Sequence, residues 1–289
     1  MKICLSCNTG FEQAAWKCPI CNWEPPIIEG YYAFSPQSST LNDGLADGAH
    51  HVLNDLQDQS FWFRGRNKII QDVIRLNFPD AANVLEIGCG SGYVLNGIRS
   101  VLPRAKLTAT EIYSYGLSYA ANRVSEPIQL LQADARSLPF KNEFDLIGAF
   151  DVLEHIEEDE KVIENIRNSL KPSGGVILTV PQHPWLWSEA DEAACHKRRY
   201  TRKQLSAILI DYGFDILLDT SFMFFILPIM MAQRLLATKK DTYNIAKELA
   251  LPKILDKTFE LLLSCERLAI NKGISFPVGG SRLVVAQLS

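Results

Sequence analysis

The sequence lacks a long apolar run, an excess of positive charge and an opening typical of secreted proteins. No run reaches the roughly 18 apolar residues of a membrane-spanning helix. The formal net charge of −4 argues against broad nucleic-acid binding. Cys7, Asn8 and Thr9 interrupt any apolar segment of a signal peptide. We therefore expect a cytoplasmic protein whose seven cysteines are metal ligands or free thiols rather than disulfides.

Four of these cysteines lie close together near the amino terminus. The pairs Cys4-x-x-Cys7 and Cys18-x-x-Cys21 have the spacing of a four-sulfur Zn²⁺ site. An asparagine follows each pair, and asparagine tolerates the left-handed backbone of such turns. Residues 1–26 therefore resemble a zinc ribbon; chance pairing or redox-active thiols are the alternatives. The ribbon could dock a partner, brace the rest of the chain or recognise substrate.

Patterning predicts one large α/β domain after this ribbon. Residues 27–60 are expected to form a linker and an amino-terminal helical segment, because Pro25-Pro26 and a polar stretch over 35–47 precede helical spacing from His51. Strands and helices then alternate within residues 61–289, which predicts a doubly wound, mostly parallel, Rossmann-like sheet. A helical insertion over about 222–272 precedes the last strand. In it, we expect a helix over 251–269 with Leu251, Leu255, Phe259 and Leu262 on one face.

A glycine-rich turn organises this domain. The apolar strand 83–87 ends at Glu86-Ile87 and runs into Gly88, Gly90 and Gly92. Glycine permits positive φ and lets a ligand approach bare backbone at a helix start. The spacing lacks the extra residue of the dinucleotide fingerprint. This turn is therefore expected to bind a ligand at the carboxyl end of the sheet.

Carboxylates close the strands that follow. Glu111 ends the second strand, where it can accept both hydroxyls of a ribose, and Ile112 follows it. Asp134 and Ala135 end the third strand, where they can meet the amino edge of an adenine. Asp151 ends the fourth strand. These positions predict a nucleoside-binding groove along one edge of the sheet.

Together these motifs resemble class I S-adenosylmethionine-dependent methyltransferases of a small-molecule or envelope-type subgroup. The resemblance covers roughly residues 60–221 and the last strand. It implies that the three glycines pass the methionine portion, that Glu111 binds the ribose and that Asp134 and Ala135 bind the adenine. Asp151 would face the methionine end, and Glu86 could bind the ligand's ammonium group. The whole predicted cofactor set is Trp62, Arg64, Glu86, Gly88, Gly90, Gly92, Glu111, Ile112, Asp134, Ala135 and Asp151.

The segment Phe61-Trp62-Phe63-Arg64 has two interpretations. Its aromatics could cover a bound ligand while an arginine reaches an anionic group, as in the subgroup it resembles. A helix packed at the sheet edge is the alternative, because large aromatics are usually core residues.

The methyl acceptor would need a base if it is a hydroxyl. His155 and His196 are the candidate catalytic residues, because imidazole titrates near neutral pH. Similar residues to Asp151, Glu154 and His155 bind a divalent metal in some quinone-pathway O-methyltransferases. Alternatively, Glu154 caps the next helix and His155 packs.

Substrate-binding candidates lie after the fifth strand. A cluster of donors there could bind a phosphate, carboxylate or sugar, and tryptophan could stack on a sugar. The candidates are His183, Trp187, Arg198, Arg199 and Tyr200. A solvated basic loop is the alternative for the charged part. The apolar run 222–232 and the basic residues up to 240 could contact a membrane surface, although a buried helix is favoured.

The hypothesis is therefore a methyltransferase that uses S-adenosylmethionine and carries Zn²⁺. Its acceptor would be a small molecule, sugar or lipid-linked compound, methylated at oxygen. No nucleic-acid partner is expected, and the sequence does not give the oligomeric state. An NAD-dependent oxidoreductase and a non-catalytic interaction protein are the alternatives.

Overall fold

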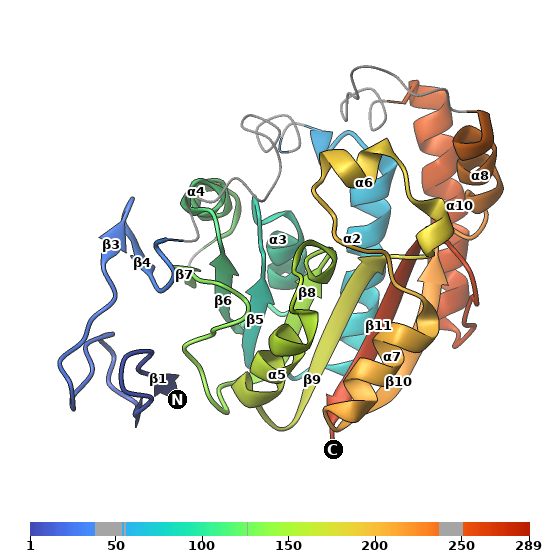
Figure 1. Cartoon of the computed structure of the whole chain (residues 1–289). Coiled ribbons are helices and arrows are strands. Elements are labelled where there is room, and N and C mark those ends of the chain that lie inside the picture. Colours follow the sequence, from blue (N-terminus) through green and yellow to red (C-terminus); the bar gives the residue numbers. More distant parts are fainter. Residues whose placement is uncertain (38–53, 55, 126, 237–250) are drawn as a thin grey trace.

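The computed structural model describes residues 1–37, 54, 56–125, 127–236 and 251–289. A nine-stranded sheet, in the order β10-β11-β9-β8-β5-β6-β7-β4-β3, forms its centre (Figure 1). The strands are β1 Lys2–Ile3, β2 Gly10–Phe11, β3 Ile27–Ile28, β4 Tyr31–Ala33, β5 Asn83–Ile87, β6 Lys106–Glu111, β7 Ile128–Gln132, β8 Phe144–Phe150, β9 Leu170–Pro181, β10 Phe214–Phe222 and β11 Ser281–Leu288. The helices are α2 Phe61–Asn77, α3 Tyr93–Val101, α4 Ser114–Arg123, α5 Asp159–Ser169, α6 Glu189–Ala193, α7 Arg202–Asp211, α8 Leu227–Leu236 and α10 Lys253–Asn271, with short 3-10 turns at Leu153–His155 and Pro184–Leu186.

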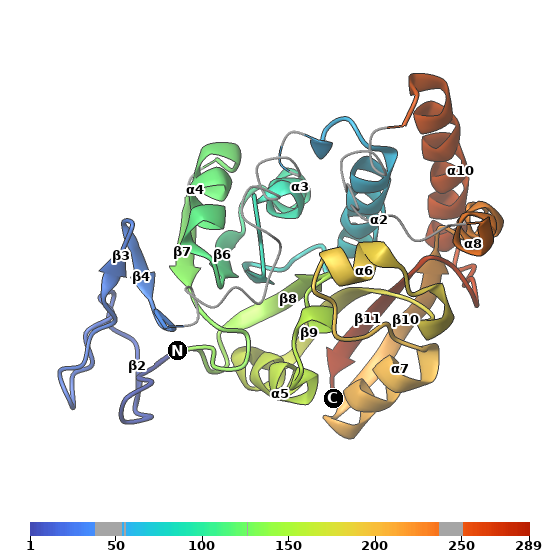
Figure 2. The ribbon, with the colours of Figure 1, turned by 45° about the horizontal axis from the view of Figure 1, so that its top comes forward.

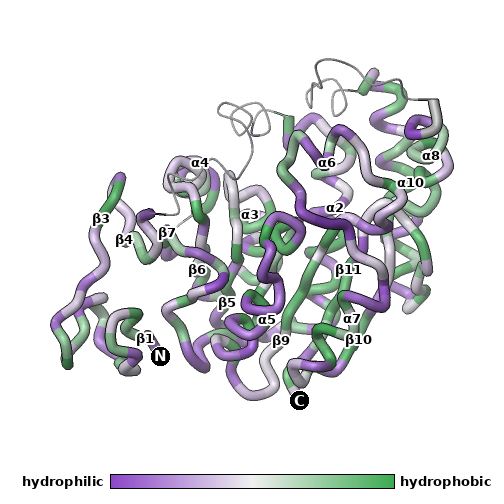
Figure 3. The backbone as a smooth tube through the Cα atoms, in the orientation of Figure 1, coloured by the Kyte–Doolittle hydropathy of each residue, from purple (hydrophilic) through white to green (hydrophobic). Residues whose placement is uncertain are grey.

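Helices cover both faces of the sheet, as the alternating pattern predicts. Helices α2, α3 and α4 lie on one face, and α5 and α7 lie on the other (Figures 1 and 2). The central strands are hydrophobic along most of their length because both of their faces are buried (Figure 3). Successive residues of β5 feed different cores: Val84 packs with the α2 side, and Leu85 and Ile87 pack with the α5 side. The expected doubly wound fold is confirmed.

The strand order reverses beside β5. The chain goes from β5 to β6 and β7 on one side, then returns to β8 on the other side. All of these pairings are parallel, so their carboxyl ends meet at one edge of the sheet. In open α/β sheets ligands bind at such a reversal. This position brings the turn after β5 and the segment after β8 together.

The segment expected to be a linker begins as part of the sheet. Strand β4 pairs parallel with β7 and β3 pairs antiparallel with β4, so residues 27–33 extend the sheet edge. The prediction missed these strands because they are two and three residues long. The polar stretch over 38–47 and the start of the expected helix at 51–53 lie outside the described residues.

The predicted face of the last long helix is confirmed in part, because Leu251, Phe259 and Leu262 pack against the core and Leu255 does not. Helix α10 packs against α2, and its buried residues are Asp256, Leu263, Glu266 and Ile270, whereas Leu255 is 45% exposed. The apolar pattern does not predict the two buried acidic side chains, which are buried because they have hydrogen-bond partners. The Asp256 carboxylate accepts a hydrogen bond from the Phe61 N–H at 2.7 Å.

The apolar run after β10 is buried only in part. Phe222, Met223, Ile226 and Leu227 are buried, but Phe225 is 45% exposed. This mixed exposure differs from the expected buried helix. Residues 237–240, which belong to the expected membrane-contacting segment, lie outside the described part of the chain. Among the described helices, none combines the length and apolar character needed to cross a bilayer.

Candidate active site

A cavity of about 960 Å³ opens along the carboxyl edge of the sheet, over the strand reversal. Nine of the predicted cofactor residues line it: Trp62, Glu86, Gly88, Gly90, Glu111, Ile112, Asp134, Ala135 and Asp151. The two candidate catalytic histidines, His155 and His196, also line it. Residues separated by about 130 positions in the sequence therefore share one groove, as the order of strands predicts.

The glycine turn after β5 has the backbone that its residues predict. Gly88, Gly90 and Gly92 have φ values of 65°, 50° and 75°. A Cβ on Gly88 would lie 2.6 Å from a Val152 methyl carbon, whereas a Cβ on Gly90 would have nothing within 4 Å. The first glycine therefore permits close packing, while the second leaves open space for a ligand. Gly92 precedes α3 but is not among the lining residues.

Glu111 connects the glycine turn to the end of β6. Its carboxylate accepts hydrogen bonds from the Gly90 N–H at 2.9 Å and the Ile112 N–H at 2.8 Å. Burial raises the pKa of Glu111, and the N–H donor of Gly90 opposes that rise. A buried carboxylate with remaining acceptor capacity is suited to binding a pair of hydroxyl groups.

The end of β7 supplies the next groups along the groove. The Asp134 carboxylate accepts bonds from the Arg136 guanidinium, with its shortest contact at 2.6 Å. The Asp134 N–H donates to the Ser35 hydroxyl at 3.3 Å, which ties this loop to the chain after β4. Ala135 lies beside it and is buried.

Arg66 is the central residue that the sequence analysis did not select. It is buried and forms an ion pair with Asp151, and its guanidinium lies 4.4 Å from the Trp62 ring centroid. Burial lowers the pKa of Arg66 to about 10, so it remains charged at neutral pH. Trp62 and Arg66 are four positions apart, so helical spacing could have identified this pair.

Glu86 is a buried acid that interacts electrostatically with this arginine. Burial raises the pKa of Glu86 well above its usual range, while Arg66 acts in the opposite direction. Its Oε2 atom is buried and has no hydrogen-bond partner among the described residues. Such an oxygen is available to a ligand's hydrogen-bond donor.

Arg64, which was predicted to contact the cofactor, points elsewhere. Its guanidinium pairs with Asp256 at 2.5 Å and with Glu260 at 2.7 Å on α10. It is not among the residues that line the cavity. The helix period explains the correction: residues two apart on α2 face different directions, so Arg66 enters the groove and Arg64 fastens α10.

A cluster of titratable groups lies across the groove from the glycine turn. One ligand atom each of Glu154, His155 and His196 lies within 4.8 Å of the others, so the trio could hold a divalent ion. The two imidazole rings pack edge to face at a centroid distance of 4.7 Å. Both carboxylate oxygens of Glu154 are buried without a hydrogen-bond partner in the described structure.

His196 is held by a buried aspartate. Its Nδ1 atom lies 2.8 Å from Asp191 Oδ1, and Asp191 also accepts two bonds from Arg199, at 2.7 and 2.9 Å. Burial opposes ionisation of Asp191, but the bonds from His196 and Arg199 prevail and lower its pKa to about 2. Because the ionised carboxylate only accepts, Nδ1 carries a hydrogen, and in the neutral form of the ring Nε2 is then the acceptor.

The predicted substrate-binding residues divide into two groups. Arg199 lines the cavity, but its guanidinium donates to Asp191 and to the Gln182 carbonyl. It therefore holds Asp191 in place instead of offering free donors to a substrate. The other four lie outside the cavity lining. Tyr200 donates to Asp159 at 2.6 Å, Arg198 pairs with Asp159 at 2.9 Å, His183 stacks on Trp185, and Trp187 is 37% exposed.

Comparisons with known proteins identify the family of this chain. A family model described as a methyltransferase domain matches residues 58–218, which is more than half of the chain. The chain belongs to the class I S-adenosylmethionine-dependent methyltransferases. This membership disfavours the NAD-dependent oxidoreductase alternative.

Individual relatives are distant. A probable S-adenosylmethionine-dependent methyltransferase of Mycobacterium tuberculosis is 25% identical over 62% of this chain and 65% of its own length. A malonyl-[acyl-carrier protein] O-methyltransferase of Priestia megaterium is 28% identical over 35% of this chain and 38% of its own length. The solved phosphoethanolamine N-methyltransferase 2 of Haemonchus contortus with S-adenosyl-L-methionine has a TM-score of 0.53 at 19% identity, covering 77% of this chain and 52% of that one. This last likeness shows the fold.

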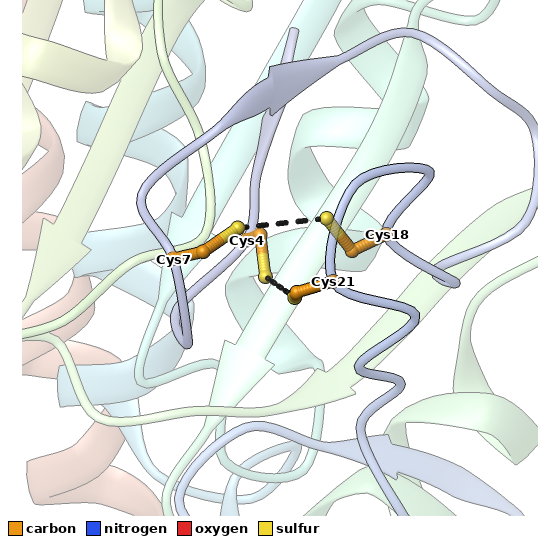
Figure 4. A group of neighbouring side chains, drawn as sticks. All are labelled: Cys4, Cys7, Cys18 and Cys21. Atoms are coloured by element: carbon orange, nitrogen blue, oxygen red, sulfur yellow. Dashed lines mark hydrogen bonds between the residues drawn. The ribbon is translucent and has the colours of Figure 1, made fainter.

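The four amino-terminal cysteines lie in the ribbon that precedes the methyltransferase domain. Their sulfurs all lie within 4.8 Å of one another (Figure 4). The Cys4–Cys21 and Cys7–Cys18 sulfur distances are 3.6 and 3.7 Å. Four sulfurs at about 2.3 Å from a tetrahedral Zn²⁺ would be about 3.8 Å apart. The turns fit as well, because Asn8 and Asn22 both have a φ of 59°.

The buried Glu154 of this methyltransferase gives a testable pH dependence. Burial raises the pKa of Glu154 to about 8, from 4.5 for an ordinary glutamate. As pH rises from 4.5 to 8, the unfolded chain is ionised while the folded chain keeps its proton, so this group lowers stability by up to about 1.4 kcal/mol per pH unit. Glu154→Gln removes that loss, so its stability relative to the native protein should rise over this range and level off above it. Urea unfolding at pH 5, 6.5 and 8 measures this; a constant difference would contradict it.

Proposed function

We propose that this protein transfers a methyl group from S-adenosylmethionine to an oxygen of a small-molecule or lipid-linked acceptor. The observation that carries the proposal is the groove itself, in which Glu111, Asp134 and Asp151 end successive parallel strands and line one cavity. The family membership supports the donor, and the paired histidines support an acceptor that must lose a proton.

The polar groups along the groove suit one orientation of S-adenosylmethionine. Glu111 would accept the two ribose hydroxyls, and Asp134 with Ala135 would meet the adenine. The methionine portion would pass Gly88 and Gly90 toward Arg66, whose charge suits the carboxylate, while the unpartnered oxygen of Glu86 suits the ammonium group. The sulfonium would then face Glu154, His155 and His196. The protein mainly has to hold the acceptor in line with the methyl group, because the donor is already activated.

His196 is the group best arranged to remove the acceptor's proton. Asp191 accepts from Nδ1, so the lone pair of Nε2 points away from that bond and belongs to a ring that lines the cavity. Asp191 would also stabilise the imidazolium that forms. His155 packs against His196 and would orient its ring.

Replacing His196 by asparagine tests this role. Methyl transfer should fall by about 100-fold or more, because general-base catalysis contributes at least that much. S-adenosylhomocysteine affinity should change by less than about threefold, since His196 is placed on the acceptor side. The assay follows label from methyl-labelled S-adenosylmethionine into an organic extract of cells. Unchanged transfer would contradict the proposal, and a strict requirement for added magnesium would assign the trio to a divalent ion.

We further propose that Cys4, Cys7, Cys18 and Cys21 bind one Zn²⁺ that folds the ribbon. Sulfur spacing and left-handed asparagines support this ion. A segment of 26 residues has little core of its own, so the metal would supply its folding energy. Its role would be structural, because four thiolates leave no open position on a tetrahedral ion.

A further inference from the structure

The cavity continues past the catalytic cluster along an apolar wall. Gly280, Met223 and Met230 line this part of the cavity. Met230 packs closely on Gly280, because its sulfur would lie 2.9 Å from a Cβ placed on that glycine. Helix α8 supplies Ile229 and Met230, helix α10 supplies Phe259, and Ile226 and Leu251 lie just before these helices. The apolar wall consists of Met223, Ile226, Ile229, Met230, Leu251 and Phe259.

This apolar wall reaches the outside of the molecule. Ile229 lines the cavity and is 41% exposed, and its neighbours Phe225 and Met231 are 45% and 41% exposed. Gln233 and Arg234, one turn farther along α8, end the apolar wall with polar groups. The cavity is thus continuous from the buried carboxylate of Glu154 to an exposed apolar mouth.

The two ends have opposite chemistry. At the inner end, the unpartnered oxygens of Glu154 and the imidazole of His196 suit a hydroxyl group. At the outer end, the lining side chains of Met223, Ile226 and Ile229 are apolar, and the hydroxyl of Ser281 lies in the part of the lining beside Gly280. Such a wall gains free energy only when it buries hydrocarbon, at about 0.8 kcal/mol for each methylene.

We infer that the acceptor is amphipathic: a hydroxyl-bearing head lies at Glu154 and His196, and a hydrocarbon chain lies along the apolar wall. This inference rests on the proposed function, because it uses the same cavity and the same base. It narrows the acceptor class to compounds with a chain long enough to span from the reacting oxygen to α8. Small, fully polar acceptors would leave the apolar wall in water.

A series of 4-alkylphenols, from ethyl to octyl, tests the inference by equilibrium binding. Calorimetry is done on the full chain with saturating S-adenosylhomocysteine, so no turnover is needed. Affinity should rise by about two- to fourfold for each added methylene, the upper figure being a fully buried methylene. The rise should stop when the chain passes Ile229 and enters solvent.

Two neighbouring methionines provide a matched pair of variants. Met230 lines the cavity and Met231 does not, although both are on α8. Met230→Gln should weaken octylphenol binding by about fivefold or more and leave ethylphenol nearly unchanged, whereas Met231→Gln should change neither by more than about twofold. Ile229→Asn is a second cavity variant that replaces Met230→Gln if the latter fails to fold. Native affinity for S-adenosylhomocysteine shows that a variant is folded.

The outcomes separate the two proposals. If S-adenosylhomocysteine does not bind the native protein, the proposed function fails and this inference fails with it. If it binds, but affinity for the phenols is independent of chain length or no phenol binds, only the amphipathic acceptor is overturned. Equal effects of Met230→Gln and Met231→Gln would also overturn it.

Discussion

Glu111→Gln should weaken S-adenosylhomocysteine binding by at least about 100-fold. The ligand's two ribose hydroxyls would lose charge-assisted hydrogen bonds of about 1.5 kcal/mol or more each, or about 3 kcal/mol in all. The amide would also place donors against the N–H of Gly90 or of Ile112, which now donate to the carboxylate. The loss should therefore appear in the dissociation constant from calorimetry.

A matched variant controls for removal of charge. Glu164 lies on α5, is exposed and does not line the cavity, so Glu164→Gln makes the same chemical change elsewhere. Its affinity for S-adenosylhomocysteine should equal that of the native protein. Glu111 would be ruled out as a ribose ligand if Glu111→Gln changed the affinity for S-adenosylhomocysteine by less than about threefold. The variant must have the same unfolding temperature as the native protein for this result to count.

Cys18→Ser should remove the metal and unfold the ribbon. Zinc content should fall from about one ion per chain to nearly none, because a structural site needs its four ligands. The lost binding free energy, about 10 kcal/mol or more in small zinc domains, is also the folding energy of the ribbon. Elemental analysis and amide hydrogen exchange over residues 1–26 measure the two effects.

The ribbon's contacts predict a second consequence for the cofactor. Ile3 donates to the Pro139 carbonyl at 2.9 Å, and the Trp16 ring packs edge to face on Phe140 at 5.7 Å. These residues belong to the loop that begins at Asp134 and Ala135. Loss of the ribbon should therefore weaken S-adenosylhomocysteine binding by about fivefold or more, the lower end of typical coupling between sites.

Cys265 supplies the control for this variant. It is an exposed thiol on α10, so Cys265→Ser makes the same substitution away from the ribbon. It should keep its zinc and its affinity for the cofactor product. Absence of metal from freshly reduced native protein, or full zinc content in Cys18→Ser, would refute the zinc proposal.

Local patterns predicted the elements that hold the groove. Strand 83–87 and the positive φ values of the glycines that follow it are predicted from residue types alone, and the structure confirms them. Each of these features depends on neighbours within a few positions, so the sequence displays its cause directly.

Contacts between residues far apart in the sequence could not be predicted from local patterns. Arg64 binds Asp256 across 192 positions, and an apolar pattern does not predict that this acidic residue of α10 is buried. The same limit applies to Asp191, which holds His196 and Arg199 and which the motif analysis did not select. The position of Arg66 in the groove could have been predicted, because it lies four residues after Trp62 and therefore on the same helix face.

The most direct test of the central claim is the structure of the protein bound to S-adenosylhomocysteine. We predict that the Glu111 carboxylate lies within hydrogen-bond distance of both ribose hydroxyls, with the ligand's sulfur facing Glu154 and His196. An adenosine bound at another edge of the sheet, or a sulfur turned away from His196, would contradict the account.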